Sequence, residues 1–203
     1  MNFLGHLYFS QDHQDLMHAN LFGDFVKGKH YENYSDIVQR GVLLHRSIDH
    51  FIDTNEHVVK LMRTLYSDLP KVSSIAIDLY FDHLLARNWE IFHQISLPTY
   101  LANFYKHLPS NLDEYPDTFQ QFLIKMKSYK WMSYYHSHEG LEKACHGVSS
   151  RISFENQLKT APSVFLTYEK EITNVFFQYM EAAQNSLLDH SADNSFIRVF
   201  NKW

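Results

Sequence analysis

The sequence predicts an all-α protein, a single compact multi-helix domain that covers residues 1–203. Three observations carry this prediction. Glycine and proline are scarce, at 6 and 5 residues in 203, apolar residues recur at helical spacing over long segments, and no segment alternates as a strand does. Hydrophobic residues at 45% and charged residues at 20% are globular proportions. A chain of this length buries roughly 70% of its unfolded surface, so it can fold without metal or disulfides.

The expected helices follow from caps, prolines and apolar periodicity. They span about 14–26, 35–53, 55–66, 72–92 and 99–107, then one that opens at Pro116 and a long one after Pro162. Gly28 closes the first, and Ser35 or Asp36 caps the second. The fourth is apolar on most of its circumference, which predicts a central position. Residues 131–153 are expected to be shorter and more irregular.

Composition argues against membrane-spanning, exported, cysteine-zinc and nucleic-acid-binding proteins. No apolar run approaches the ~18 residues that span a bilayer, so we expect a soluble chain, and the apolar start, Met1 to Phe9, is too short for an export signal. Cys145 is the only cysteine, which excludes a cysteine zinc cluster and fits the reducing cytoplasm. The net charge of -5 argues against a broad nucleic-acid surface. We therefore expect a cytoplasmic protein with neither nucleic-acid nor membrane partners.

Polar side chains occupy the apolar stripes of two helices. At ~100° per residue, His45 falls near the centre of the stripe of helix 35–53, Asp49 projects beside it and Asp53 lies at the edge. In helix 72–92, Asp82 and His83 fall on or beside the stripe. A buried carboxylate is costly unless it is paired or bound to a cation.

Two explanations fit these buried groups. One is a cross-helix ion pair, His45 with Asp82 or His83 with Asp49. The other is a divalent metal, because imidazole and carboxylate together are a normal ligand set for first-row metals. Residue types alone leave both open.

Two further polar residues lie in apolar surroundings. Asp24 follows Gly23, which permits close backbone approach, and is either an exposed acid at a helix end or a third carboxylate of the site. His6 is either a satisfied core histidine or a member of the site. The segment from Gly23 to His30 matches nucleotide-binding spacing except at its last position, where His30 replaces Ser or Thr, and it lacks the preceding strand. We interpret that match as chance.

Several short motifs stand between Met1 and Trp89. They are Met1-Asn2-Phe3-Leu4 with His6-Leu7, Asn20-Leu21 with Gly23-Asp24-Phe25-Val26-Lys27-Gly28, Gly41 with His45-Arg46 and Ile48-Asp49, Asp53, and Asp82-His83-Leu84-Leu85-Ala86 with Trp89. Together they resemble the acyl carrier protein phosphodiesterase family, a divergent branch of the HD-type metal-dependent phosphohydrolases. The resemblance implies an HD-like helical core and removal of 4'-phosphopantetheine from holo acyl carrier protein, with Mn²⁺ or Mg²⁺ as cofactor.

The resemblance also implies roles for particular residues. The metal ligands would be Asp24, His45, Asp49, Asp82 and His83. His6 would act as a ligand or proton carrier, Arg46 would neutralise phosphate, and either His6 or His83 would protonate the departing serine oxygen. Tyr8 departs from the family pattern, since related members have a second histidine there.

Holo acyl carrier protein, the implied substrate, is acidic, so a negatively charged chain must dock it locally. We expect a basic patch at the site mouth that draws on Lys27, Lys29, Arg40, Arg46, Arg63, Arg87 and Arg151. Two alternatives remain: an HD-like phosphohydrolase of a nucleotide or small phosphate ester, and a non-catalytic helical binding domain whose Asp and His residues pair with each other.

Overall fold

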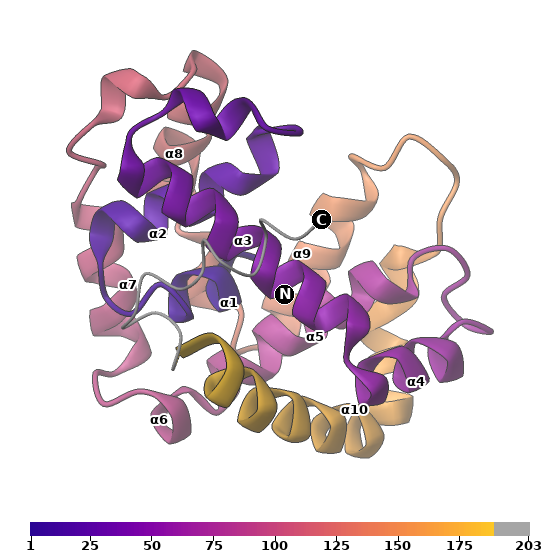
Figure 1. Cartoon of the computed structure of the whole chain (residues 1–203). Coiled ribbons are helices and arrows are strands. Elements are labelled where there is room, and N and C mark those ends of the chain that lie inside the picture. Colours follow the sequence, from indigo (N-terminus) through magenta and orange to yellow (C-terminus); the bar gives the residue numbers. More distant parts are fainter. Residues whose placement is uncertain (189–203) are drawn as a thin grey trace.

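Figure 1 shows a computed structural model of the chain, which describes residues 1–188, and in that range every regular element is a helix. The all-α prediction is confirmed. The helices are α1 (Phe3–Tyr8), α2 (Gln14–Leu21), α3 (Asp36–Thr54), α4 (Glu56–Leu65), α5 (Ser73–Arg87), α6 (Trp89–Phe92), α7 (Leu97–Lys106), α8 (Asp117–Tyr129), α9 (His138–Ser149) and α10 (Ala161–Ala183). Short 3₁₀ turns are η1 (Phe22–Phe25), η2 (His30–Asn33), η3 (Leu112–Glu114), η4 (Trp131–Tyr134) and η5 (Leu158–Thr160), and a π turn, η6 (Gln184–Leu188), follows α10.

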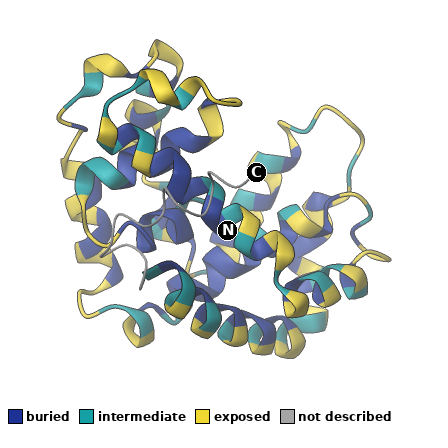
Figure 2. Ribbon diagram, in the orientation of Figure 1, coloured by how far each residue is buried: buried dark blue, intermediate teal, exposed yellow. Residues whose placement is uncertain are grey.

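Helix α5 is the centre of the molecule. It contacts α1, α4, α9 and α10, and its residues are buried on most sides, as its apolar circumference predicts. Tyr80 and Phe81 on α5 pack against the rings of Phe165 and Phe176 on α10. Helix α3 crosses the face of the molecule over α2 and η1, with its buried side turned inward (Figures 1 and 2). These helices share one hydrophobic core.

The short helix α1 is attached to α5 by a carboxylate. The backbone N–H groups of Leu4 and Gly5 donate to the two oxygens of Asp82, at 2.7 and 3.0 Å. Those N–H groups lie in the first turn of α1, where a helix has no internal acceptors. Asp82 therefore caps a helix from another part of the chain and fixes where α1 begins.

Three elements differ from their predicted form. The helix expected over 14–26 is α-helical only to Leu21 and continues as the tighter turn η1. The helix expected over 72–92 is interrupted at Asn88, whose side chain donates to the Leu84 carbonyl and so satisfies the end of α5. The expectation of irregular structure over 131–153 is wrong for α9, a 12-residue helix whose N-terminus is capped by the Ser137 side chain on the Gly140 N–H.

Among the described helices, none combines the length and apolarity that a membrane span requires.

Two residues noted from the sequence, Cys145 and Tyr8, have defined surroundings. Cys145 is buried in α9, and burial raises the pKa of its thiol to about 12. The Tyr8 hydroxyl accepts a hydrogen bond from the Gln184 side chain at 2.6 Å. Tyr8 thus ties α1 to the end of the described chain.

Candidate metal centre

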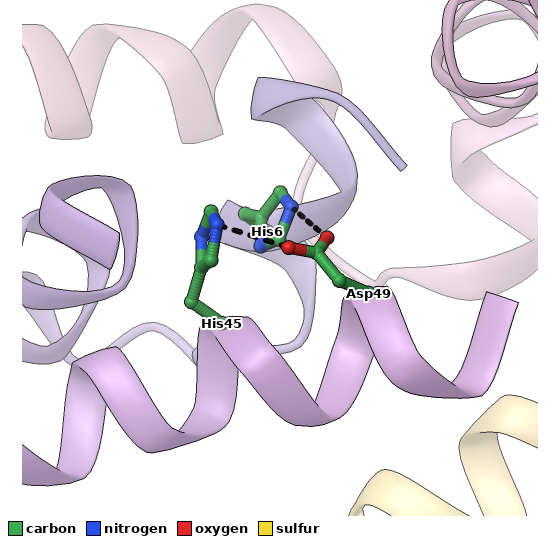
Figure 3. A group of neighbouring side chains, drawn as sticks. All are labelled: His6, His45 and Asp49. Atoms are coloured by element: carbon green, nitrogen blue, oxygen red, sulfur yellow. Dashed lines mark ion pairs between the residues drawn. The ribbon is translucent and has the colours of Figure 1, made fainter. Parts of the chain in front are cut away.

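His6, His45 and Asp49 meet between α1 and α3. Figure 3 shows both α3 side chains pointing from one face of the helix toward His6 on α1. One ligand atom from each residue lies within 4.8 Å of the others, and no other set of three such residues in the described part of the chain does so. The proximity of His45 and Asp49 predicted from helical spacing is confirmed.

The contacts in this group are short. His45 Nε2 lies 3.1 Å from Asp49 Oδ2, and His6 Nε2 lies 3.4 Å from Asp49 Oδ1. The two imidazole rings stack with centroids 4.2 Å apart and 17° between their planes. His6 and His45 are buried, while the Asp49 side chain is 45% exposed. The group therefore has protein on one side and an opening on the other.

Asn20 on α2 fixes the orientation of the His6 ring. Its amide nitrogen donates to the His6 carbonyl and to Ser10 Oγ, both at 3.0 Å, so its oxygen is left to accept from His6 Nδ1 at 2.9 Å. This assigns the ring proton to Nδ1. In the neutral ring, the Nε2 lone pair then faces two oxygens, the Met1 carbonyl at 3.0 Å and the Asp49 carboxylate.

Lone pairs of His6 Nε2, the Met1 carbonyl and the Asp49 carboxylate face one another, and a positive charge between them would relieve their repulsion. Burial lowers the pKa of His6 and the neighbouring His45 lowers it further, against the opposing effect of Asp49, and this favours the neutral ring. A neutral Nε2 that faces a carbonyl and a carboxylate is repelled by both unless a cation lies among them. Two imidazole nitrogens with carboxylate oxygens form a donor set that suits a first-row divalent metal. The residues present fit such an ion.

Opposite charges hold His45 against the two carboxylates of the group. Burial opposes a charge on His45, but its hydrogen bonds with Asp24 and Asp49 outweigh burial and raise its pKa to about 9. Burial likewise opposes ionisation of Asp49 and Asp24, yet the contact with His45 keeps the pKa of each carboxyl below its ordinary value. The site therefore carries two carboxylates for one imidazolium, and binding a metal would release the imidazolium proton.

Asp24 approaches His45 from η1. Its Oδ1 lies 3.4 Å from His45 Nε2, and its side chain is 59% exposed. Gly23 makes this approach possible, because a Cβ at that position would lie 2.2 Å from Cγ of His45. Asp24 is thus exposed, as one interpretation of its sequence expected, and it lies beside His45, as the other expected.

Asp82 and His83 lie outside this group, although both are buried as expected. Asp82 accepts from the first turn of α1, and burial raises its pKa to about 7. His83 Nδ1 donates to the Tyr135 carbonyl at 2.6 Å, and burial lowers its pKa to about 4. The structure shows neither of the cross-helix ion pairs considered from sequence, and a metal role for these two residues stays a prediction.

Arg46, which the resemblance assigns to phosphate, and Arg87, expected in the basic patch, both have protein partners. Arg46 Nη2 donates to the Val26 and Gly28 carbonyls at 3.2 and 2.6 Å, and its guanidinium lies 4.9 Å from the centre of the Tyr31 ring. It thereby holds the segment that follows Asp24. Arg87 pairs with Glu169 on the surface at 2.7 Å.

Two members of the site were not singled out from sequence. Asn20 is fully buried, and its role depends on how α1 packs on α2. The Met1 carbonyl is a backbone group, which no side-chain pattern reveals. A buried amide beside apolar residues was the one available signal for Asn20.

Two cavities adjoin at this centre. The first, here the metal cavity, has a volume of about 380 Å³ and is lined by the cluster of His6, His45 and Asp49 and by three further acids, Asp24, Asp53 and Asp78. The second, here the aromatic cavity, has a volume of about 570 Å³ and is walled by Phe3, Phe25, Phe122 and Trp131. Lys125, Lys143 and Arg151 also line the aromatic cavity. Asn2, Phe3 and Val148 line both.

Comparison with known proteins gives a consistent result. A family model described as acyl carrier protein phosphodiesterase matches residues 1–183, which include every residue of the cluster. Curated proteins of that name from Pectobacterium atrosepticum and Yersinia pestis are 29% and 31% identical over 152 and 153 residues, 74% of this chain and 79% of each relative. One from Enterobacter sp. is 24% identical over 180 residues, 88% of this chain and 93% of the relative. No solved structure matches the chain.

Proposed function

The chain belongs to the acyl carrier protein phosphodiesterase family, and on that premise we propose that it hydrolyses the phosphodiester of holo acyl carrier protein to release 4'-phosphopantetheine. The observation that carries this proposal is the cluster of His6, His45 and Asp49 beneath an open cavity. The alternative, a helical binding domain with mutually paired core groups, does not account for the cavity that opens onto these residues.

We propose that His6, His45 and Asp49 hold a divalent metal, with Asp24 beside it. Two imidazole donors favour Mn²⁺ over Mg²⁺, which prefers oxygen ligands and retains its waters. When bound, the ion would supply a hydroxide at neutral pH and neutralise charge on the phosphoryl oxygens.

The protein residues supply position and proton transfer. Asn20 keeps Nε2 of His6 directed at the site, and we propose that Asp24, ionised and exposed, takes the proton of an attacking water. The departing serine oxygen needs a proton, and of the two imidazoles expected to give it, only His6 belongs to the cluster. We therefore keep His6 as a ligand, because its neutral ring carries its one proton on Nδ1 and has none on Nε2 to give, and we assign no chemistry to His83. Arg46 we assign to holding the loop after Asp24.

The proposed substrate is a folded protein, so the enzyme needs residues that bind the carrier as well as residues that act on the phosphodiester. Lys27 and Lys29 are exposed in the segment that follows Asp24, and Arg151 lines the aromatic cavity. We propose that these residues of the predicted basic patch meet the acidic carrier. The buried Cys145 fits a reducing compartment, and we propose the cytoplasm, where carriers of fatty acid biosynthesis work.

The test is hydrolysis of purified holo acyl carrier protein, followed as its mass shift to the apo form. We expect activity that EDTA abolishes and Mn²⁺ restores, and at least a hundredfold loss of kcat in His45→Ala and Asp49→Ala. His50→Ala, an exposed histidine on the same helix, is the matched control. Full activity in both cluster variants would contradict the proposal, and hydrolysis of small phosphate esters in preference to the carrier would favour the alternative phosphohydrolase.

A further inference from the structure

We propose that the aromatic cavity binds the pantetheine arm of the substrate while its phosphate lies in the metal cavity. This inference rests on the proposed function, and it assigns a subsite to residues of α8, η4 and α9 that lie outside the metal cluster.

The two cavities are adjacent and share part of their walls. Asn2 and Phe3 at the start of α1 and Val148 on α9 line both, and α1 also carries His6. A phosphate bound at His6, His45 and Asp49 would therefore lie beside the aromatic cavity, with the first turn of α1 between the two.

Size decides which end of the substrate enters. A phosphodiester joins two groups, here a serine of a folded carrier protein and a flexible arm. The aromatic cavity, at about 570 Å³, lies within the range of roughly 300–1,000 Å³ that holds small ligands. A folded carrier cannot enter it, so the carrier stays at the protein surface and the arm is the part that fits inside.

The lining matches the chemistry of the arm, a chain with a dimethyl-substituted carbon, two amides and a thiol. Phe3 lies 5.4 Å from Phe122 and 6.1 Å from Trp131 between ring centroids, and Phe25 lies 5.3 Å from Phe122. These rings form an apolar wall for the methyl groups. Lys125 and Arg151 add donors for amide oxygens at the same cavity. An apolar wall with a few polar groups is the usual composition of a ligand site.

Gly147 is a position from which the aromatic cavity can be filled by substitution. It lies within α9, where glycine costs about 0.5–1 kcal/mol relative to alanine. A Cβ at Gly147 would meet no atom within 4 Å, so packing does not require a glycine there. Gly147 lines the aromatic cavity, so a side chain at this position would enter the cavity.

Filling that space tests the inference. Gly147→Trp should lower kcat/KM for holo acyl carrier protein at least tenfold, and lower it much further than kcat/KM for methyl p-nitrophenyl phosphate, a diester without an arm. It should also weaken binding of pantetheine, which has no phosphate, at least tenfold by calorimetry. Thr118→Trp fills the same cavity from α8 and serves if the first variant fails to fold.

The matched control is His146→Trp, which places the same side chain one residue away on the exposed side of α9. It should bind pantetheine and process the carrier as the unmodified protein does. Folded Gly147→Trp and Thr118→Trp proteins with unchanged pantetheine binding would overturn the inference. So would a loss confined to acylated carrier, since the cavity would then hold the acyl group. Pantetheine binding needs no catalysis, so it separates this outcome from failure of the proposed function.

Discussion

Asn20 shows how a single buried amide can decide the chemistry of a neighbour. Its hydrogen bonds to the His6 carbonyl and to Ser10 leave its oxygen free for His6 Nδ1, and this sets the lone pair of Nε2 toward Asp49. A partner of this kind makes an imidazole a better ligand by fixing its tautomer and orientation.

Replacing Asn20 should therefore weaken metal binding without removing a ligand. We expect Asn20→Ala to raise the Kd for Mn²⁺ by about 10–100-fold, measured by titration calorimetry on metal-free protein. Asn88→Ala, which removes a half-buried amide bonded to Leu84, is the control and should bind as before. An unchanged Kd in the Asn20 variant would show that Asn20 does not orient the ligand.

His18 provides a residue-level prediction about pH and stability. Its ring is buried against Phe104, its Nδ1 donates to the Gln14 carbonyl at 2.7 Å, and burial lowers its pKa to about 4. The folded pKa lies below the unfolded one, so the neutral ring stabilises the fold above about pH 6.5. That contribution is lost as pH falls toward 4, at up to about 1.4 kcal/mol per pH unit.

The measurement is urea unfolding at pH 7 and pH 5. The free energy of unfolding should fall more between these values in the unmodified protein than in His18→Phe, whose ring carries no titratable group. Equal losses in the two proteins would mean that His18 titrates alike in the folded and unfolded states.

At the scale of helices, the position of α1 determines whether the site exists. A helix of 6 residues is too short to be stable alone. Asp82 supplies acceptors for its first turn, and through α1 it positions His6 without belonging to the cluster.

This role separates Asp82 from Asp49 in a measurable way. In metal-free protein, Asp82→Ala should lower the free energy of unfolding by about 2–4 kcal/mol, because two buried N–H groups lose their acceptor. Asp49→Ala should cost less than about 1 kcal/mol, because its carboxylate is partly solvated. Urea unfolding in EDTA checks both. Loss of Mn²⁺ binding in Asp82→Ala with unchanged metal-free stability would instead identify Asp82 as a ligand.

The same elements show what the sequence can and cannot predict. The His45–Asp49 contact follows from helix geometry alone, and the bounds of α3 and α4 follow from their local sequence to within one residue, so these could be predicted. The inward position of Asp82 was also predictable, but its partners are backbone N–H groups 77 and 78 residues away. Helix α9 was missed because Gly140 and Gly147 weaken its local signal, while tertiary packing of Leu141 and Cys145 stabilises it.

For the whole molecule, charge distribution matters more than net charge. The chain carries a net charge of -5, yet Lys27 and Lys29 are exposed close in sequence to Asp24. Local opposite charges guide association even when two proteins have the same sign overall, and salt screens this guidance.

Charge reversal at Lys27 should therefore act on binding and depend on salt. We expect Lys27→Glu to raise KM for holo acyl carrier protein severalfold at low ionic strength with kcat unchanged, and the difference to vanish near ~0.5 M salt. Lys170→Glu, on the exposed side of α10, is the control and should match the unmodified protein. A KM indifferent to salt in both would contradict docking by this patch.

The attachment of α1 to Asp82 has a consequence for how the protein matures. The contact joins segments 78 residues apart in sequence, so it forms only after α5 has packed. We therefore expect His6 to reach its place late in folding, so that a bound ion would not be the nucleus around which the chain collapses. On the proposed function, metal would load after folding, and protein treated with a chelator would keep its helices and recover activity when the ion is returned.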